Sequence, residues 1–214
     1  MLKFWNMLDT SASPQRTVYV LGKDGVLYCR PEAAFVAKDN TPWQRVADLG
    51  PYHTSIAVDC GYIYAVNEEL GVDFQCVKGA NRGRWAFLAA GYVVDVASTS
   101  GTIYGCGRGV AGDPVYKHHR GGGSYPWDAC SGGKVRSISV DPCGKNIFGI
   151  GADDWVYTQP LAEMTCHSRW AKTYRAGGVI ISFAILGEGE ALGVRQDQLW
   201  YLRDGHLNGE WALE

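Results

Sequence analysis

A tryptophan recurs along the chain at nearly constant spacing. The residues are Trp43, Trp85, Trp127, Trp170 and Trp211, and the gaps between them are 42, 42, 43 and 41 residues. A fixed period of this length indicates a repeat architecture, in which each unit buries its apolar face against its neighbours. The spacing therefore limits the chain to solenoids, propellers or similar arrays.

Two further sequence features, called marks here, recur with the same period as the Trp residues. A short apolar strand follows about 20 residues after each of the first four Trp residues, and a fifth copy precedes Trp43. These strands cover 18–21, 63–66, 103–106, 147–150 and 191–194. An aromatic residue in a second short strand supplies the third mark, at Tyr28, Phe74, Tyr116, Tyr157 and Tyr201. Three marks in register over the whole chain make the repeat secure.

Each unit predicts four strands, named A to D in chain order. In the second unit strand A is 55–58, strand B is 62–66, strand C is near 72–77, and strand D begins at Trp85. A unit of this length with four antiparallel strands is one β-propeller blade. Helical repeats of similar length need amphipathic helices, whereas the 28 glycines and the β-branched runs of this chain favour strands and tight turns.

We therefore predict an all-β fold with one five-bladed β-propeller domain over residues 1–214. The expected blades are 1–46, 47–88, 89–130, 131–173 and 174–214. Trp5 precedes Trp43 by 38 residues, so it fits either a sixth strand D or strand A of the first blade. We favour strand A over Leu2–Leu8, because 9–16 is polar and contains Pro14. The ring then closes by packing the first blade against the last, with no strand shared between the termini.

Composition excludes several function classes. The net charge is −2, so the broad basic surface of a nucleic-acid-binding protein is absent. The first ten residues lack the pattern of a secretory signal, and no apolar run approaches the ~18 residues of a membrane span. The seven cysteines are an odd number without a CxxC pair, which favours reduced thiols over zinc ligands or a disulfide framework. We expect a cytoplasmic protein without membrane insertion, metal or cofactor.

A propeller offers two faces for binding. The C–D loops and A–B turns share one face, here called the loop face, and the B–C turns and D–A links share the other, the link face. Polar residues precede each repeated Trp, and an aromatic plane beside polar groups suits a sugar. We therefore expect shallow sugar sites between blades on the loop face, with Tyr62 and Asp59 beside Trp43. The candidate residues are Asn40, Trp43, Asp59, Tyr62, Asn81, Arg84, Trp85, Tyr125, Trp127, His167, Arg169, Trp170, Asn208 and Trp211. The alternative is that the repeated Trp only packs between blades, which is the usual use of such an aromatic.

The chain offers little for catalysis. We expect His118 and His119 to form an exposed loop pair after a strand, which does not suit a shared metal. The glycine-rich segment 105–112 lies between strands, so it lacks the helix N-terminus of a phosphate-binding loop. No catalytic triad follows from the spacing, and we expect the protein not to be an enzyme.

The units resemble tectonin repeats. The likeness lies in segments 43–50, 85–91 and 170–177, which run from a Trp to a Gly, followed by the Gly-x-Ile-Tyr-Gly/Ala pattern of strand B and the aromatic of strand C. The resemblance to the tectonin and tachylectin-like family covers essentially the whole chain. It departs most in the first unit, where the connection 31–42 is long.

The resemblance implies a leaderless lectin of innate defence that agglutinates foreign glycans. The implied ligands are O-methylated mannose or fucose, or lipopolysaccharide, and clumping of cells implies a homo-oligomer. A protein-interaction propeller without a sugar site is the competing class, because one fold hosts many functions. Repetition of the polar groups from blade to blade would favour the lectin, and a single contact patch would favour the scaffold. A hydrolase would need acids or histidines at the central channel.

Overall fold

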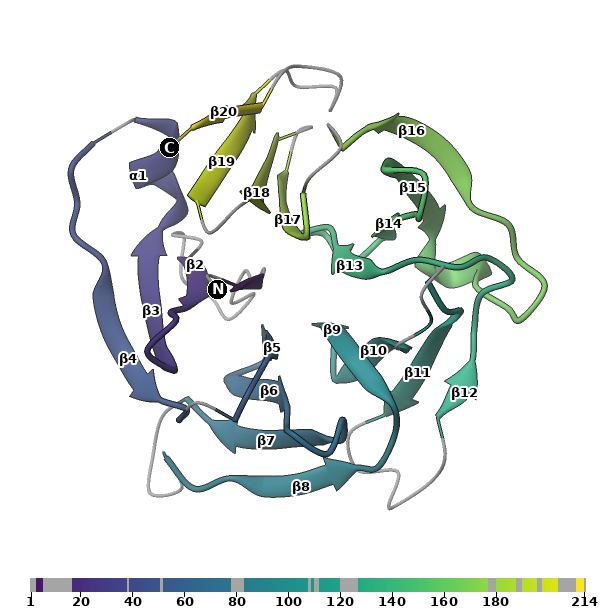
Figure 1. Cartoon of the computed structure of the whole chain (residues 1–214), viewed down its shortest axis with the longest axis horizontal. Coiled ribbons are helices and arrows are strands. Elements are labelled where there is room, and N and C mark those ends of the chain that lie inside the picture. Colours follow the sequence, from purple (N-terminus) through teal and green to yellow (C-terminus); the bar gives the residue numbers. More distant parts are fainter. Residues whose placement is uncertain are drawn as a thin grey trace.

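Five four-stranded antiparallel sheets form a ring in the computed structural model (Figure 1). The structure describes residues 3–5, 17–37, 39–50, 52–77, 83–107, 109, 112–119, 127–176, 180–187, 190–195, 198–203 and 211–213. Within each sheet the strands lie in chain order, and the first strand is nearest the centre of the ring. The prediction of an all-β, five-bladed propeller is confirmed.

The first three blades take the following strands. Blade one consists of β1 (Lys3–Trp5), β2 (Thr17–Leu21), β3 (Val26–Pro31) and β4 (Gln44–Asp48). Blade two consists of β5 (Ser55–Asp59), β6 (Tyr62–Val66), β7 (Val72–Cys76) and β8 (Ala86–Ala89). Blade three consists of β9 (Val93–Thr99), β10 (Thr102–Gly107), β11 (Val115–His119) and β12 (Asp128–Ala129).

The remaining two blades repeat this order. Blade four consists of β13 (Ser137–Val140), β14 (Asn146–Ile150), β15 (Trp155–Pro160) and β16 (Ala171–Arg175). Blade five consists of β17 (Ser182–Gly187), β18 (Glu190–Arg195), β19 (Gln198–Arg203) and β20 (Trp211–Leu213). The helical segments of the described residues are α1 (Glu32–Val36) and the one-turn 3-10 helix Leu161–Glu163, both in C–D loops.

The ring closes without a shared strand, as the sequence predicted. The five A strands surround the axis, and β1 contacts both β5 and β17. Trp5 lies in β1 opposite Tyr19, so the segment around it is strand A of blade one and not a sixth strand D. Among the described residues, side-chain packing joins the last blade to the first.

Five hydrophobic clusters fill the spaces between neighbouring blades within the described part of the chain. Each cluster draws its buried residues from two blades, and one repeated Trp is half-buried against it. In order of the ring these are Trp85 between blades one and two, Trp127 between two and three, Trp170 between three and four, Trp211 between four and five, and Trp43 between five and one. The packing role considered for the repeated Trp is therefore present in every blade.

A glycine in strand B makes room for the indole ring in three blades. Gly105, Gly149 and Gly193 occupy equivalent positions, opposite Tyr116, Tyr157 and Trp200 of strand C. A Cβ atom at Gly149 would lie 2.5 Å from Val135 Cγ1 and 3.2 Å from Trp170 Cη2. Strand B therefore needs glycine here because the tryptophan ring lies directly on its backbone.

The aromatic mark of strand C is equivalent in only three blades. Tyr28, Tyr116 and Tyr157 share one register position, but Phe74 pairs with Tyr64, one position further along. Tyr201 is displaced in the same way, opposite Leu192. The expectation of one common mark is wrong for blades two and five, because a shift of one residue turns a side chain to the other face of the sheet. Asp73 and Trp200 hold the equivalent positions.

A buried carboxylate joins three blades near the axis. Asp95 is 3% exposed and lies on β9. Its Oδ1 accepts a hydrogen bond from the Ser55 hydroxyl at 3.1 Å, and its Oδ2 accepts one from the Ile138 amide at 2.9 Å. Blades two, three and four are therefore held in register by one side chain in addition to apolar packing.

Replacing Gly149 with Ala should lower the free energy of unfolding by about 1–3 kcal/mol, because the added methyl group meets Val135 and Trp170 in a filled interface. Chemical denaturation measures the change. Combining Gly149→Ala with Val135→Ala should cost less than the sum of the two single changes, since the shortest contact is then removed. A change in the single variant of less than half a kilocalorie would contradict the packing of Trp170 described above.

Replacing Asp95 with Ala should destabilise the fold by about 2–3 kcal/mol, because the buried Ile138 amide and Ser55 hydroxyl lose an acceptor. The exposed Asp128 on the short edge strand β12 provides a matched control. Asp128→Ala should change stability by less than about 0.5 kcal/mol. Equal effects of the two substitutions in urea denaturation would remove the role assigned to Asp95.

Candidate functional site

The sequence-predicted site residues do not gather into one pocket. Asn81, Tyr125 and Asn208 lie outside the described residues. Among the other predicted site residues, Asn40, Arg84, His167 and Arg169 are exposed. The five repeated Trp residues are half-buried between blades. The structure therefore distributes the predicted residues around the ring.

Asp59 and Tyr62 were expected to close a pocket beside Trp43, and this is wrong. Tyr62 packs at the interface of blades two and three, whereas Trp43 packs between blades five and one. Asp59 is 2% exposed, and its Oδ2 accepts a hydrogen bond from the Gly101 amide at 2.7 Å. The carboxylate joins the A–B turns of adjacent blades, so its role is structural.

The indole rings point toward the link face. The Trp127 Nε1–H donates to the Ala90 carbonyl oxygen at 2.9 Å, and Ala90 belongs to the D–A link that precedes blade three. The same ring also lies over Gly105 of strand B. Gly105 pairs with Tyr116, which is two residues closer to the B–C turn than His118 on the same strand. The wall that each Trp could offer to a ligand is therefore on the face opposite to the predicted one.

Blades three and four carry equivalent hollows on the link face. The blade-four hollow has a volume of about 410 Å³ and the blade-three hollow about 240 Å³. Each is lined by a D–A link, the following B–C turn, a strand C tyrosine and the repeated Trp. The main lining residues are Gly133, Val135, Gly151, Asp153, Tyr157 and Trp170 in blade four, and Gly91, Val93, Gly107, Asp113, Tyr116 and Trp127 in blade three.

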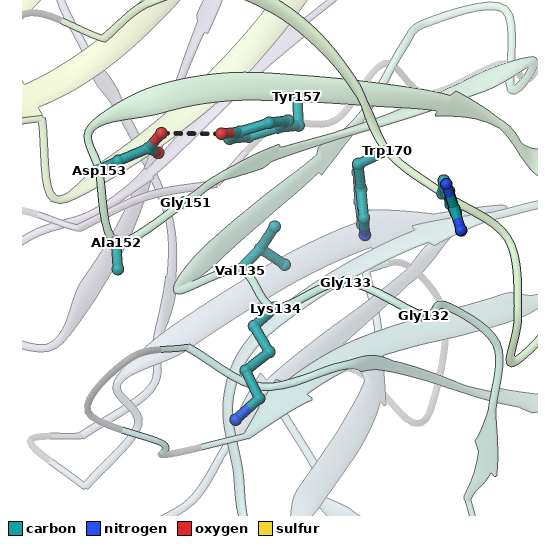
Figure 2. A pocket seen from close by; sticks show the side chains of 10 residues that line it. Gly132, Gly133, Lys134, Val135, Gly151, Ala152, Asp153, Tyr157 and Trp170 are labelled. Carbon is teal, nitrogen blue, oxygen red and sulfur yellow. Dashed lines mark hydrogen bonds between the residues drawn. The ribbon is translucent and has the colours of Figure 1, made fainter.

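Figure 2 shows the blade-four hollow with Trp170 on one side and the Asp153–Tyr157 pair on another, around Val135. The link glycines let the chain pass close to the indole: a Cβ atom at Gly91 would lie 2.9 Å from Trp127 Nε1, and one at Gly133 would clash with the Trp170 ring. The two links therefore approach the Trp in the same way, and the hollow opens above this contact.

A tyrosine–aspartate hydrogen bond fixes the polar side of the blade-four hollow. The Tyr157 hydroxyl donates to Asp153 Oδ2 at 2.8 Å, and the Trp155 amide donates to Oδ1 at 3.3 Å. Burial raises the pKa of Asp153, but these bonds and the Lys172 ammonium outweigh it and bring the pKa below its usual value. Burial and the same bond raise the pKa of Tyr157. Near neutral pH the carboxylate is ionised and the phenol keeps its proton.

Blade one repeats this polar pair. The Tyr28 hydroxyl donates to Asp24 Oδ2 at 2.7 Å, and the Val26 amide donates to Asp24 Oδ1 at 3.1 Å. The cation on strand D is also repeated, because Arg45 lies opposite Tyr28 as Lys172 lies opposite Tyr157. The Asp24–Tyr28 pair of blade one, however, lines neither of the two hollows.

Blade two fills the equivalent space with its own side chain. His53 stacks on Trp85, with ring centroids 4.3 Å apart, where blades three and four have Val93 and Val135. Its Nδ1 lies 2.7 Å from the Leu49 carbonyl oxygen and its Nε2 lies 3.5 Å from Asp73 Oδ2. The imidazole thus lies on the face of the Trp85 indole and occupies the space that the smaller Val93 and Val135 leave open in the other two blades.

Sequence reasoning missed the aspartates and tyrosines of the link face. A signal was present, because 22–28 and 151–157 share the pattern Gly-x-Asp-x-x-x-Tyr. This pattern places the carboxylate in the B–C turn and the tyrosine two residues into strand C, within hydrogen-bond reach of each other. It marks blades one and four, while in blade three a longer turn separates Gly107 from Asp113.

The two adjacent histidines differ from the expectation of an exposed loop pair. Both lie on β11, and His118 is buried with its ring 5.5 Å from that of Trp127. His119 is exposed and its Nδ1 lies 3.0 Å from the Thr102 hydroxyl. Among the described residues no group of three or more His, Cys, Asp or Glu side chains could hold a metal ion, and none of the described helices has the length and apolar character needed to cross a membrane.

Comparisons with solved structures find propellers at low sequence identity. A gluconolactonase from Xanthomonas campestris is 11% identical with a TM-score of 0.61, over 93% of this chain and 72% of that one. A Bacteroides thetaiotaomicron protein of unknown function is 14% identical with a TM-score of 0.57, over 90% of this chain and 56% of that one. A chain from a nidogen–laminin complex is 9% identical with a TM-score of 0.52, over 88% of this chain and 89% of that one.

The shared property is the fold. No protein-family model matches this sequence, and no curated protein matches it. The similar structures include an enzyme, a component of a protein complex and a protein of unknown function. Fold similarity at these identities does not assign an activity, so function has to be argued from the hollows themselves.

The cysteines differ in their burial, and this predicts which of them react. All seven are free, with Cys60, Cys143 and Cys166 exposed and Cys106 and Cys130 buried. Burial raises the pKa of Cys130 to about 12, and burial raises that of Cys106 well above its usual value. At pH 8 a maleimide should label the three exposed thiols first, because the thiolate is the reactive form. Mass spectrometry should find the two buried thiols labelled only after unfolding; labelling of Cys106 in the native protein would contradict the structure.

Proposed function

We propose that the chain is a glycan-binding protein whose sites are the link-face hollows of blades three and four. The observation that carries the proposal is repetition: two neighbouring blades present the same combination of a link glycine, a Trp edge, a Tyr and an Asp around a hollow. A repeated site is typical of a multivalent lectin, whereas a scaffold has no need to repeat its contacts. The function is binding and not catalysis.

The chemistry of the hollows suits a sugar. Trp170 and Tyr157 offer aromatic surface to the C–H groups of a pyranose ring, and Asp153 offers carboxylate oxygens to hydroxyl groups. Val135 lies between them, and Val93 does so in blade three. A small apolar recess next to polar groups favours a ligand with an O-methyl group, and O-methylated mannose or fucose are the sugars we propose to test first.

Both hollows open on the link face, which affects agglutination. Two sites on one face raise the effective affinity for a single glycan-coated surface. Joining two cells requires sites that point in opposite directions, which two rings paired through closed symmetry provide. We therefore propose a homo-oligomer, with the link faces directed outward. The loop-face residues Asn40, Arg84 and His167 stay candidates for a second set of contacts.

A protein-interaction role is the second candidate, and one observation favours it. Three large apolar side chains are exposed on blade two and the links on either side of it: Tyr52 is 61% exposed, Phe87 57% and Tyr92 81%. Tyr52 and Tyr92 lie in successive D–A links, and the Phe87 ring approaches Gly71 of the B–C turn between them. Exposed aromatic residues are enriched at protein interfaces, so this part of the link face could hold a protein instead of a sugar.

Filling the blade-four hollow tests the glycan proposal. Ala152 is exposed and lines this hollow from the B–C turn, so Ala152→Trp occupies the space without disturbing the core. Calorimetry with an O-methylated mannose or fucose glycoside should show the stoichiometry fall by one site. The affinity of the remaining sites should change less than about twofold, since distant sites act independently.

The matched control concerns the opposite face. Asn81→Ala, in the sequence between strands C and D of blade two, should leave the stoichiometry unchanged if the sites are the link-face hollows. Loss of a site in the Asn81 variant but not in the Ala152 variant would show that the sugar binds on the loop face. The protein would still be a lectin. Absence of binding to every sugar of a glycan array, with one protein partner recovered by pull-down, would favour the scaffold.

A further inference from the structure

We infer that the blade-four hollow selects a sugar with an anionic substituent, whereas the blade-three hollow takes an uncharged sugar. The inference rests on the proposed function and assigns a different class of ligand to each of the two proposed sites. It follows from the charges around two hollows that are otherwise built alike.

Two cations border the blade-four hollow without a counter-charge. Lys134 belongs to the D–A link and Arg169 immediately precedes the repeated Trp, and both side chains are exposed and line the hollow. Neither makes an ion pair or a side-chain hydrogen bond with another described residue. The hollow therefore offers a guanidinium and an ammonium, each of which donates charge-assisted hydrogen bonds to an anionic group.

The negative charge of the carboxylate in the same hollow is already balanced. Asp153 accepts hydrogen bonds from the Tyr157 hydroxyl and the Trp155 amide, and Lys172 Nζ lies 3.4 Å from its Oδ2. The neighbouring Asp154 is paired with Arg136, with 2.5 Å between Oδ1 and Nη2. Both acids are therefore compensated, and the positive charge of Lys134 and Arg169 remains available to a ligand.

The arrangement leaves room for a sugar between the two kinds of group. Figure 2 shows Lys134 below Val135, on the side away from the Asp153–Tyr157 pair. A pyranose ring in the hollow can thus direct hydroxyl groups to the pair and an anionic substituent to the cationic side. Lys134 has a flexible stem of four carbons, so its ammonium can follow the substituent.

The blade-three hollow has the opposite character. Tyr92 takes the place of Lys134 in the D–A link, and it is 81% exposed. The charged residue among those that line this hollow is Asp113, whose Oδ2 accepts a hydrogen bond from the Gly109 amide at 2.6 Å. An anionic sugar would meet a carboxylate here without a cation among the described lining residues. An aromatic surface and an acceptor favour a neutral sugar.

Matched glycans test this division. The probes are methyl glucuronoside against methyl glucoside, and sulfated or sialylated against unmodified oligosaccharides, printed on one array with the O-methylated sugars. The test variant carries Lys134→Ala and Arg169→Ala. The control carries Lys145→Ala and Arg45→Ala, which removes two cations from blades four and one away from the hollow. A glycan that pairs with both cations should lose at least tenfold in affinity in the test variant, because charge-assisted hydrogen bonds are the stronger class.

The control should bind acidic glycans within about twofold of the wild type, as expected when surface charge far from a site is screened. Neutral glycans should bind both variants equally. Introducing Tyr92→Lys should add acidic-glycan binding at blade three, which calorimetry would record as a higher stoichiometry in a Lys134→Ala/Arg169→Ala background.

The outcomes separate this inference from the proposed function. Binding of neutral glycans alone would overturn the anionic assignment but leave the proposed glycan-binding function standing. Acidic binding that survives in the Lys134→Ala/Arg169→Ala variant, or falls equally in the control, would also overturn it. Absence of binding to any glycan would remove the proposed function and the inference with it. Loss of acidic binding in the test variant alone supports the assignment, and whether carboxylated or sulfated probes bind identifies the substituent.

Discussion

The contact between a tryptophan ring and the strand beneath it governs this molecule. Each repeated Trp leaves strand D, crosses its own sheet and fills the space against the preceding blade, as Trp127 and Trp170 do over Gly105 and Gly149. This contact fills the space between blades, and in three of them it leaves room only for glycine in strand B. The edge of the ring that remains uncovered becomes the floor of a hollow. Packing and binding surface therefore come from the same side chain.

This double use explains which parts of the structure could be predicted from the sequence. The period of the Trp residues and the apolar strand B runs were enough for the number of blades, the strand order and the way the ring closes, because each depends on spacing alone. The direction of the indole rings depends on side-chain torsion angles and on what the preceding link leaves open. No spacing encodes this, so the expected loop-face pocket of Asp59, Tyr62 and Trp43 was wrong.

The individual sites could not be predicted from the repeat, for a related reason. A repeat shows what the blades share, whereas the sites are made by what differs: His53 covers Trp85 in blade two, Val93 leaves Trp127 open, and Lys134 replaces Tyr92 in blade four. The Gly-x-Asp-x-x-x-Tyr pattern could have indicated the polar pair of blades one and four. It could not have indicated that only the blade-four pair lines a hollow, because the hollow also needs a link from the neighbouring blade.

The junction between the last blade and the first has a further consequence. At the other four interfaces a D–A link connects the two blades, whereas among the described residues this interface consists of packed side chains such as Val20, Leu192 and Trp43. An interface without a covalent connection can come apart while every sheet stays intact. Blade one of one copy could then pack against blade five of another, which is domain swapping between identical surfaces. At high concentration the same contacts that close a ring would link opened rings into chains.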